Sequence, residues 1–528
     1  MSPARVPPGR ALACTILRVF VVAQAPSALA ESAPTAQRHA VVARALFATL
    51  YVVSAVLLFA SHVREFADES DNLLGGLLLV RGERLYVDYF SSHMPFAYYV
   101  AAIPAALGAV QLEHFRPFTN VLLLLTTAFL TLTFWNVLPR AVLATWAVLT
   151  VFAHALQFGE MLTAGTTAGF GCLAAGMLFY ANPMLRFDWK QTLGLSAAVF
   201  VAVQSELLAL YPLAVLGVVY VVRMWRHPLE MLRVAAVVAA PNAAVLLVFY
   251  LQGSLPAMVY DTVQFNQTYY SQFLMSASPA QMLHDWEAQY RTFIFNSLTD
   301  PLGIQGVLVL ANLGAAALVW SRRGPLVGIA YYAFVALSHI RTEDGYYLVS
   351  YMSIALLLVW AVDCVERRRA SVQTAVAVVC LLIGMNFVVR VALTYDFSRE
   401  PARNAQEVPV ILALTQPGDR IFVGPYDPYI YLATNRMPAA TSEFFFPWQA
   451  IDPRSSEQVV SELRASRPPV IVFRRMEAVN DRWLAGEYAA SLLDALSADY
   501  VTLDGMSDVL VPRDRLAEME QRLQSVRQ

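Results

Sequence analysis

Charged residues are scarce in this chain of 528 residues: they make up 14% of it, against about 25% in an average soluble domain. Hydrophobic residues make up 58%. So few charges exclude a water-soluble fold of this size, which needs more of them to cover its surface. They also exclude an intrinsically disordered chain, because such chains are polar and highly charged. The 4 cysteines are too few for a disulfide scaffold.

Lysine is almost absent, since Lys190 is the only one, and the other basic residues are arginines. The arginines are scattered along the chain rather than gathered into a patch, which excludes nucleic acid as a partner. No pair of cysteines has the spacing of a metal site or a redox pair. The net charge of −2 carries no information about partners.

Apolar runs with roughly the length of a membrane-spanning helix recur along most of the chain. They lie at about 45–61, 95–110, 118–137, 141–158, 163–181, 191–222, 234–251, 303–320, 325–340, 346–364 and 373–392. The run 191–222 is too long for one span, and Glu206 and Pro212 lie near its middle, so it is predicted to form two. The run 95–110 is short and contains Pro104 and Gly108, so we expect a helix that lies in the outer interface.

Arginine-rich loops set the orientation, because short loops rich in Arg or Lys face the cytoplasm. Five loops qualify, at Arg140, at Arg186 and Lys190, at 223–233, at 322–323 and at 367–369. All five fall on one side only if 95–110 does not cross and 191–222 crosses twice. The sequence therefore predicts an all-α polytopic membrane protein with about 11 transmembrane helices, an interfacial helix and an outer C-terminus.

Three regions follow from this topology. Residues 11–30 resemble a secretory signal peptide, but Arg18 interrupts the apolar stretch and cleavage would invert the arginine pattern. We therefore predict a poorly ordered cytoplasmic leader over 1–44. The transmembrane domain covers 45–395 and includes an outer loop, 62–116. Residues 396–528 are predicted to form a small extracytoplasmic α/β domain, with strands at 421–424 and 470–473 and helices at 456–466 and 486–497.

The outer loop contains the richest group of reactive side chains. Asp68, Glu69 and Asp71 closely follow the first span, and Asp88 and His93 come later. Carboxylates at a membrane boundary are costly unless they are solvated or paired. Such a group is able to supply a general base or to hold a divalent cation through oxygen ligands. The alternative is a solvated loop whose acids avoid the basic inner side.

The order of these residues resembles the GT-C glycosyltransferases, and most nearly the bacterial branch near the protein O-mannosyltransferases and the lipid A aminoarabinose transferase. The matching residues of the outer loop are Asp68, Glu69, Gly82, Leu85, Tyr86, Asp88, His93 and Pro95. Further similarity lies in Gln252 and Gly253, in Phe265, Asn266, Tyr269 and Tyr270, and in the segment from Arg341 to Leu348. The similarity covers most of residues 45–435.

The resemblance implies a membrane glycosyltransferase of the inner (plasma) membrane. Its donor would be a hexose or pentose linked to a polyprenyl phosphate, and its acceptor an envelope glycan, a lipid or a protein. An acid of the first loop acts as general base on the acceptor in such enzymes. Many members use no metal while oligosaccharyl relatives do, so the resemblance assigns no metal ligand here and leaves a divalent cation open. Membrane lipid is the other expected partner.

The resemblance also suggests roles for particular residues. Asp68 occupies the position of the catalytic acid, Glu69 is its usual neighbour, and Glu160 is placed where relatives often have a second acid. The expected substrate contacts are Asp88, His93, Arg341, Tyr346 and Tyr347.

Each of these residues has a simpler alternative. Glu160 is equally well explained as a helix-end carboxylate in water, and His93 as an interfacial histidine bonded to a carbonyl group. Arg341 has Glu343 and Asp344 beside it as ion-pair partners. The chain also has Gln204, Ser205 and Glu206 where many relatives have a lysine, which weakens the case for phosphate binding.

Two other classes of function compete with the enzyme. A transporter is disfavoured because the polar residues gather at one face and no pair of Gly- or Pro-broken spans recurs in corresponding halves. A non-catalytic protein of envelope assembly remains, in which the outer tail binds a partner. Release of polyprenyl phosphate from a labelled donor would distinguish the three classes.

Overall fold

The computed structural model describes residues 33–61, 65–182, 184–274, 300, 302–339, 347–366, 371–395, 406–479 and 482–527. Arg341 and Tyr346, two of the expected substrate contacts, lie outside these residues. The same holds for the basic loop at 367–369 and for most of the predicted leader.

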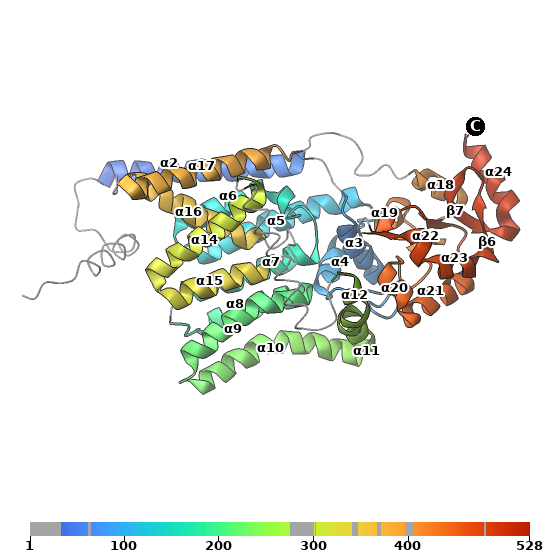
Figure 1. Cartoon of the computed structure of the whole chain (residues 1–528), viewed down its shortest axis with the longest axis horizontal. Coiled ribbons are helices and arrows are strands. Elements are labelled where there is room, and N and C mark those ends of the chain that lie inside the picture. The colour runs from blue at the N-terminus through green and yellow to red at the C-terminus, as the bar shows by residue number, and fades with distance from the viewer. Residues whose placement is uncertain are drawn as a thin grey trace, which may run out of the picture.

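Apolar helices form a bundle that fills one part of the molecule (Figure 1). Among the described residues, seven helices are long and apolar enough to cross a membrane: α5 (Leu112–Phe134), α7 (Ala164–Ala181), α9 (Leu210–Met224) with the turn before it, α10 (Pro228–Leu251), α14 (Ile304–Arg323), α16 (Tyr347–Glu366) and α17 (Ser371–Ala392). The other predicted spans correspond to α2 (Ala33–Ala60), α6 (Arg140–Phe152), α8 (Trp189–Ser205) and α15 (Pro325–Ser338). The chain is a multi-pass membrane protein, as the sequence predicted.

The long apolar run at 191–222 does form two helices. Helix α8 ends at Ser205, and Glu206 has an extended backbone with φ −155 and ψ 131. A single 3-10 turn, η2 (Leu207–Ala209), then leads into α9. The break therefore lies at Glu206, while Pro212 falls in the first turn of α9, where a missing backbone N–H disturbs no helical hydrogen bond. Glu206 marks a tight turn.

The first outer loop contributes two short helices, α3 (Ala67–Val80) and α4 (Phe96–Ala106), at the end of the bundle near the C-terminal domain (Figure 1). Helix α4 is about 16 Å long at a rise of 1.5 Å per residue, well short of a bilayer core. It packs closely on α3, because a Cβ added at Gly76 would lie 2.5 Å from the Cβ of Ala101. Only glycine permits this approach, so α3 and α4 form one compact unit.

The outer loop between α10 and α14 begins with the short helix α11 (Leu255–Val259), the π-helix η3 (Tyr260–Tyr270) and α12 (Ser271–Leu274). It lies beside α4 and the C-terminal domain (Figure 1). The side-chain amide of Asn266 donates to the carbonyl oxygen of Ser92 at 2.9 Å, which ties η3 to the first outer loop.

The described part of the tail forms a five-stranded sheet with helices around it. The strand order is β2-β1-β3-β7-β6, with β1 parallel to β2 and β3, and β7 antiparallel to β3 and β6. The elements are α18 (Glu407–Leu414), β1 (Arg420–Gly424), α19 (Pro428–Thr434), β2 (Met437–Pro438), α20 (Pro447–Ile451), α21 (Pro453–Ser466), β3 (Ile471–Phe473), β4 (Ala478–Val479), β5 (Trp483–Leu484), α22 (Ala485–Tyr488), α23 (Ala490–Ser497), β6 (Tyr500–Leu503), β7 (Met506–Pro512) and α24 (Leu516–Arg527). The strands and helices expected in the tail are present at the expected places.

The tail shares a hydrophobic core with the first outer loop. Leu73, Leu74 and Leu77 of α3 are buried in the same cluster as Ile430 and Leu432 of α19. The backbone N–H of Phe90 donates to the carbonyl oxygen of Thr441 at 2.9 Å. Arg420 of the tail and Glu83 of the first outer loop form a partly exposed ion pair at 2.5 Å. Removal of the tail would therefore expose apolar side chains of α3, so deletion is not a clean test of its role.

Candidate active site at the start of α3

The acids that the sequence groups together point to different partners in the structure. Asp68, Glu69 and Asp71 lie in the first turns of α3. Because an α-helix has 3.6 residues per turn, Asp68 and Asp71 lie on neighbouring positions of one side of the helix, while Glu69 faces another side. Asp68 is partly exposed, whereas Glu69 and Asp71 are 0% and 4% exposed. The side chains therefore occupy separate environments.

Asp68 lies at the junction of the first outer loop and the C-terminal domain. The hydroxyl of Tyr426 donates to its Oδ1 at 3.0 Å. Burial, and then the neighbouring Asp68, raise the pKa of Tyr426 well above its usual range, so the phenol stays a hydrogen-bond donor. The Tyr426 ring packs against Phe444 and Phe446, which fix its position. Asp68 is also at the positive end of the α3 dipole, where negative charge is stabilised.

Glu69 forms a buried ion pair with Arg116 of α5. The two guanidinium nitrogens donate to the two carboxylate oxygens at 3.0 and 2.7 Å. Arg116 also donates to the carbonyl oxygen of Glu160 at 2.6 Å, and the N–H of Leu162 donates to Glu69 at 3.2 Å. Burial raises the pKa of Glu69 to about 7, while Arg116 acts in the opposite direction. These contacts fasten α3 to α5 and to the turn before α7.

Glu160, the second expected acid, is 4% exposed and lies on the same turn as Leu162. A cavity of about 150 Å³ beside it is lined by Glu160, Arg116, Asn120, Glu113 and Ser61, among others. Glu69 and Glu160 thus meet around Arg116. Burial rules out a carboxylate in bulk water as the explanation of Glu160.

Asp71 joins a second buried network that includes an acid from the C-terminal domain. Tyr98 donates to its Oδ2 at 2.7 Å, and Tyr89 donates to its Oδ1. Glu443, which is 0% exposed, accepts from Tyr89 at 3.2 Å and is hydrogen-bonded to Asp71. Burial, and then the charge of Asp71, raise the pKa of Glu443 well above its usual value. Burial in this network therefore favours the neutral form of Glu443.

Asp88 and His93 lie farther along the first outer loop. Arg84 donates to both oxygens of Asp88, at 2.9 and 3.0 Å, and this hydrogen bond lowers the pKa of Asp88. The half-buried His93 is held through its backbone, because the hydroxyl of Tyr86 donates to its carbonyl oxygen at 2.9 Å. Tyr86 has a left-handed backbone with φ 70, which makes this turn a strained one.

Tyr347 is the one expected contact at the start of α16 that the structure describes. It is buried, and its ring packs against His339 with centroids 5.5 Å apart.

A polar pocket of about 140 Å³ lies where the first outer loop, η3 and the C-terminal domain meet. Its walls include Tyr86, Asp261, Ser442, Arg454 and Gln458. Burial raises the pKa of Asp261 to about 8, while Arg454 acts in the opposite direction. The pocket places groups able to bond to sugar hydroxyls beside the first outer loop.

The described residues contain no group of three or more His, Cys, Asp or Glu side chains placed to hold a metal ion. The acids of the outer loop do not converge, because each is drawn to a different tyrosine or arginine. The cation site that the sequence left open therefore has no set of ligands in this part of the chain.

Four residues of these networks were not singled out from the sequence. Arg116 had a signal, since it is an arginine in an apolar segment on the outer side, where basic residues are infrequent. Asp71 was seen only as one of the loop acids. Tyr426 and Glu443 gave no local signal, because they lie in the tail, far along the chain from their partners.

The bundle, the short helices α3 and α4 and the C-terminal α/β domain define a class: a multi-pass membrane protein with a group of carboxylates where the bundle meets that domain. No family model and no curated protein matches the sequence. The chain is similar in structure to ArnT from Cupriavidus metallidurans in the apo state, with 13% identity, coverage of 90% of this chain and 98% of that one, and a TM-score of 0.47.

Two other solved structures are similar in the same way. ArnT bound to undecaprenyl phosphate has 14% identity, a TM-score of 0.45, and coverage of 89% of this chain and 97% of that one. The oligosaccharyltransferase AglB from Archaeoglobus fulgidus, in complex with an inhibitory peptide and a dolichol-phosphate, has 13% identity and a TM-score of 0.49, covering 90% of this chain and 77% of that one. At such identities and TM-scores these neighbours assign no substrate, and the proposal below rests on this chain's own residues.

Proposed function

We propose that the protein is a glycosyltransferase of the inner (plasma) membrane that works at the outer face. It moves one hexose or pentose from a polyprenyl-phosphate carrier to a hydroxyl group of an envelope glycan, a lipid or a protein. The observation that carries the proposal is the setting of Asp68. Asp68 is a partly exposed carboxylate between the first outer loop and the C-terminal domain, and it accepts a hydrogen bond from Tyr426.

In this mechanism Asp68 is the catalytic base. Its carboxylate takes the proton of the acceptor hydroxyl while the acceptor oxygen bonds to the anomeric carbon of the sugar. The bond from that carbon to the carrier oxygen breaks at the same time, and its electron pair leaves with polyprenyl phosphate. Attack and departure occur on opposite faces, so the anomeric configuration inverts. Phosphate is a good leaving group and needs little help from an acid.

Glu69 and Glu160 are proposed to support this step indirectly, through their positions around Arg116. The Glu69–Arg116 pair fixes the first turn of α3, which sets the direction of Asp68. Glu160 lies on the other side of Arg116 and balances its charge. Both acids are positioning residues in this scheme, because each lies in the buried surroundings of a guanidinium group.

The carrier phosphate is proposed to contact His93 and Arg341, and Tyr346 and Tyr347 to border its path. A guanidinium group binds a phosphodiester through two parallel hydrogen bonds, which favours Arg341 for this task. Asp88 contributes by holding the turn that precedes His93, through Arg84. The polar pocket around Asp261 and Arg454 is a suitable place for the acceptor, since the C-terminal domain forms one of its walls.

The test is transfer by Asp68→Asn in membranes or detergent. The probes are labelled polyprenyl-phosphate hexoses and pentoses, and the measured product is polyprenyl phosphate. Loss of a general base lowers the rate by about 10²–10⁴-fold, so turnover should fall by that factor with donor binding intact. Glu487→Gln is the control, because Glu487 is an exposed acid of the C-terminal domain that takes no part in the proposed site.

Native turnover in Asp68→Asn would show that another carboxylate is the base. Glu160→Gln and Glu69→Gln are then the next variants to measure. Full activity in all three would mean that no acid of this site removes the proton, and the proposed mechanism would be wrong.

A further inference from the structure

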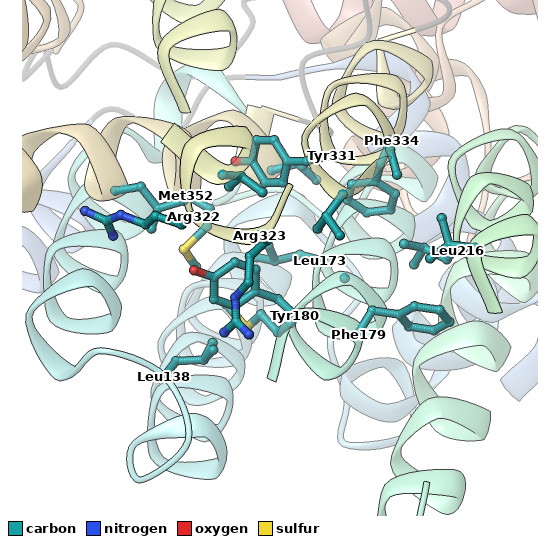
Figure 2. Close-up of a pocket in the computed structure, with 18 of the residues that line it drawn as sticks. Leu138, Leu173, Phe179, Tyr180, Leu216, Arg322, Arg323, Tyr331, Phe334 and Met352 are labelled. Carbon is teal, nitrogen blue, oxygen red and sulfur yellow. The ribbon is translucent and has the colours of Figure 1, made fainter. Parts of the chain in front are cut away.

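A cavity of about 430 Å³ lies inside the helix bundle, a volume in the range of ligand sites. Its walls come from α6, α7, α9, α14, α15 and α16. They are almost entirely apolar, with Leu173, Leu216, Phe334 and Met352 among them (Figure 2). The proposed carrier site lies elsewhere, at the end of the bundle that bears α3.

Three arginines are among the residues that line this cavity. Arg223 is in the last turn of α9, and Arg322 and Arg323 are in the last turn of α14. These helix ends lie at the side of the bundle away from the C-terminal domain (Figure 1). Arg323 lies over the ring of Tyr180, 5.4 Å from its centroid, as Figure 2 shows. No aspartate or glutamate is among the described residues that line the cavity.

Arginines at this end are expected for topology alone, so what matters is that three of them line one cavity. Arg226 and Arg233 belong to the same basic end but do not line the cavity. Arg226 lies over the ring of Trp225, and Arg233 is close to Glu230 at 3.9 Å. By contrast, Arg223, Arg322 and Arg323 come from two helices that are distant in the sequence and surround one apolar space.

We propose that this cavity binds an anionic glycerophospholipid of the inner leaflet, with one acyl chain inside the bundle and the phosphate at these three arginines. An apolar space within a membrane bundle suits a hydrocarbon chain and repels polar solutes. Basic pockets between helices on the cytoplasmic side are suited to anionic headgroups. A guanidinium group binds phosphate through two parallel hydrogen bonds. The polyprenyl carrier is not the occupant, since its phosphate must reach Asp68 at the opposite end.

The experiment uses the full chain, purified in detergent and stripped of lipid. Phosphatidylglycerol and phosphatidylcholine with identical acyl chains are added, and bound lipid is counted by native mass spectrometry. The native chain should retain phosphatidylglycerol in preference. Affinity should fall about fivefold for each arginine removed, so Arg322→Gln with Arg323→Gln should weaken it about 25-fold. Arg226→Gln is the matched control and should bind as the native chain does.

A second variant tests the acyl chain. Ala330 of α15 lines the cavity, and Ala330→Phe should narrow it and weaken binding of both lipids without changing any charge. Arg223→Gln alone provides a further test of the headgroup if the double variant does not fold, as judged by its elution and melting temperature.

Three outcomes would overturn the proposal. Equal binding of the two lipids would show that the cavity does not select an anionic headgroup. Unchanged binding in the arginine variants would show that the headgroup does not lie at these arginines. Displacement of phosphatidylglycerol by glycerol 3-phosphate at equal concentration would mean an anion site without an acyl chain. None of these readouts depends on sugar transfer, so they test the binding of an anionic lipid separately from the proposed function; the exclusion of the polyprenyl carrier alone rests on that function.

Discussion

Replacement of Glu443 by glutamine should make the protein less sensitive to pH. Glu443 is fully buried in the interface between the C-terminal domain and α3, hydrogen-bonded to Asp71. Burial, and then Asp71, raise its pKa well above the ordinary value of 4.5. The folded protein therefore holds the proton of Glu443 to a higher pH than the unfolded chain does.

The sign and size of the effect follow from this difference. Above a pH of about 4.5 the folded state binds one proton more than the unfolded state, so stability falls as the pH rises towards the folded pKa. The slope is about 1.4 kcal/mol per pH unit. Glu443→Gln keeps the shape and the hydrogen-bonding groups but has no proton to lose. Between the unfolded and the folded pKa of Glu443, the variant's free energy of unfolding should therefore rise relative to that of the native chain, by at most about 1.4 kcal/mol per pH unit.

The assay is chemical denaturation of the full chain in detergent at several pH values, followed by tryptophan fluorescence. Glu487→Gln is the matched control, because Glu487 is an exposed acid of the same domain. Its pH dependence should be that of the native chain. Parallel curves for Glu443→Gln and the native chain would refute the raised pKa of Glu443, because the slope would then come from other groups.

Two more variants test the contacts around Asp68. Arg116→Met leaves the Glu69 carboxylate buried without its guanidinium partner and should lower the free energy of unfolding by about 3–5 kcal/mol. The melting temperature should fall, and adding Glu69→Gln to the same chain should partly restore it. A native melting temperature in Arg116→Met would contradict this. Tyr426→Phe removes a hydrogen bond to a carboxylate, so turnover should fall about tenfold and the acid limb of the pH–rate profile should move to higher pH. Tyr488→Phe, which loses a bond to the Phe445 carbonyl, is its control, and an unmoved acid limb would argue against the contact with Asp68.

The sequence was sufficient for the architecture. Apolar runs determine membrane helices through their length alone, because every backbone group in a bilayer must be paired within its own segment. The placement of arginines then predicted two spans in the run 191–222 and none in 95–110. The structure has helices α8 and α9 in 191–222 and the short helix α4 in 95–110. Strands β1 and β3 could be predicted for a similar reason, since each is a short buried run after a turn.

The sequence also brought Asp68 and Glu69 to attention, but it did not separate their settings. Neighbours in a helix point in different directions, and only the tertiary structure decides what each one meets. Glu69 meets Arg116, which is 47 residues away, and Asp68 meets Tyr426, 358 residues away. Contacts at such separations leave no local pattern, because they depend on how whole helices and domains pack.

The C-terminal domain shows the difference most clearly. Its fold follows from its own strands and turns. Its docking on α3 through Ile430 and Leu432 brings Tyr426 to Asp68 and Glu443 to Asp71. Hydrophobic burial is non-directional, so the sequence determines that these surfaces are apolar and leaves to the tertiary structure which of them meet.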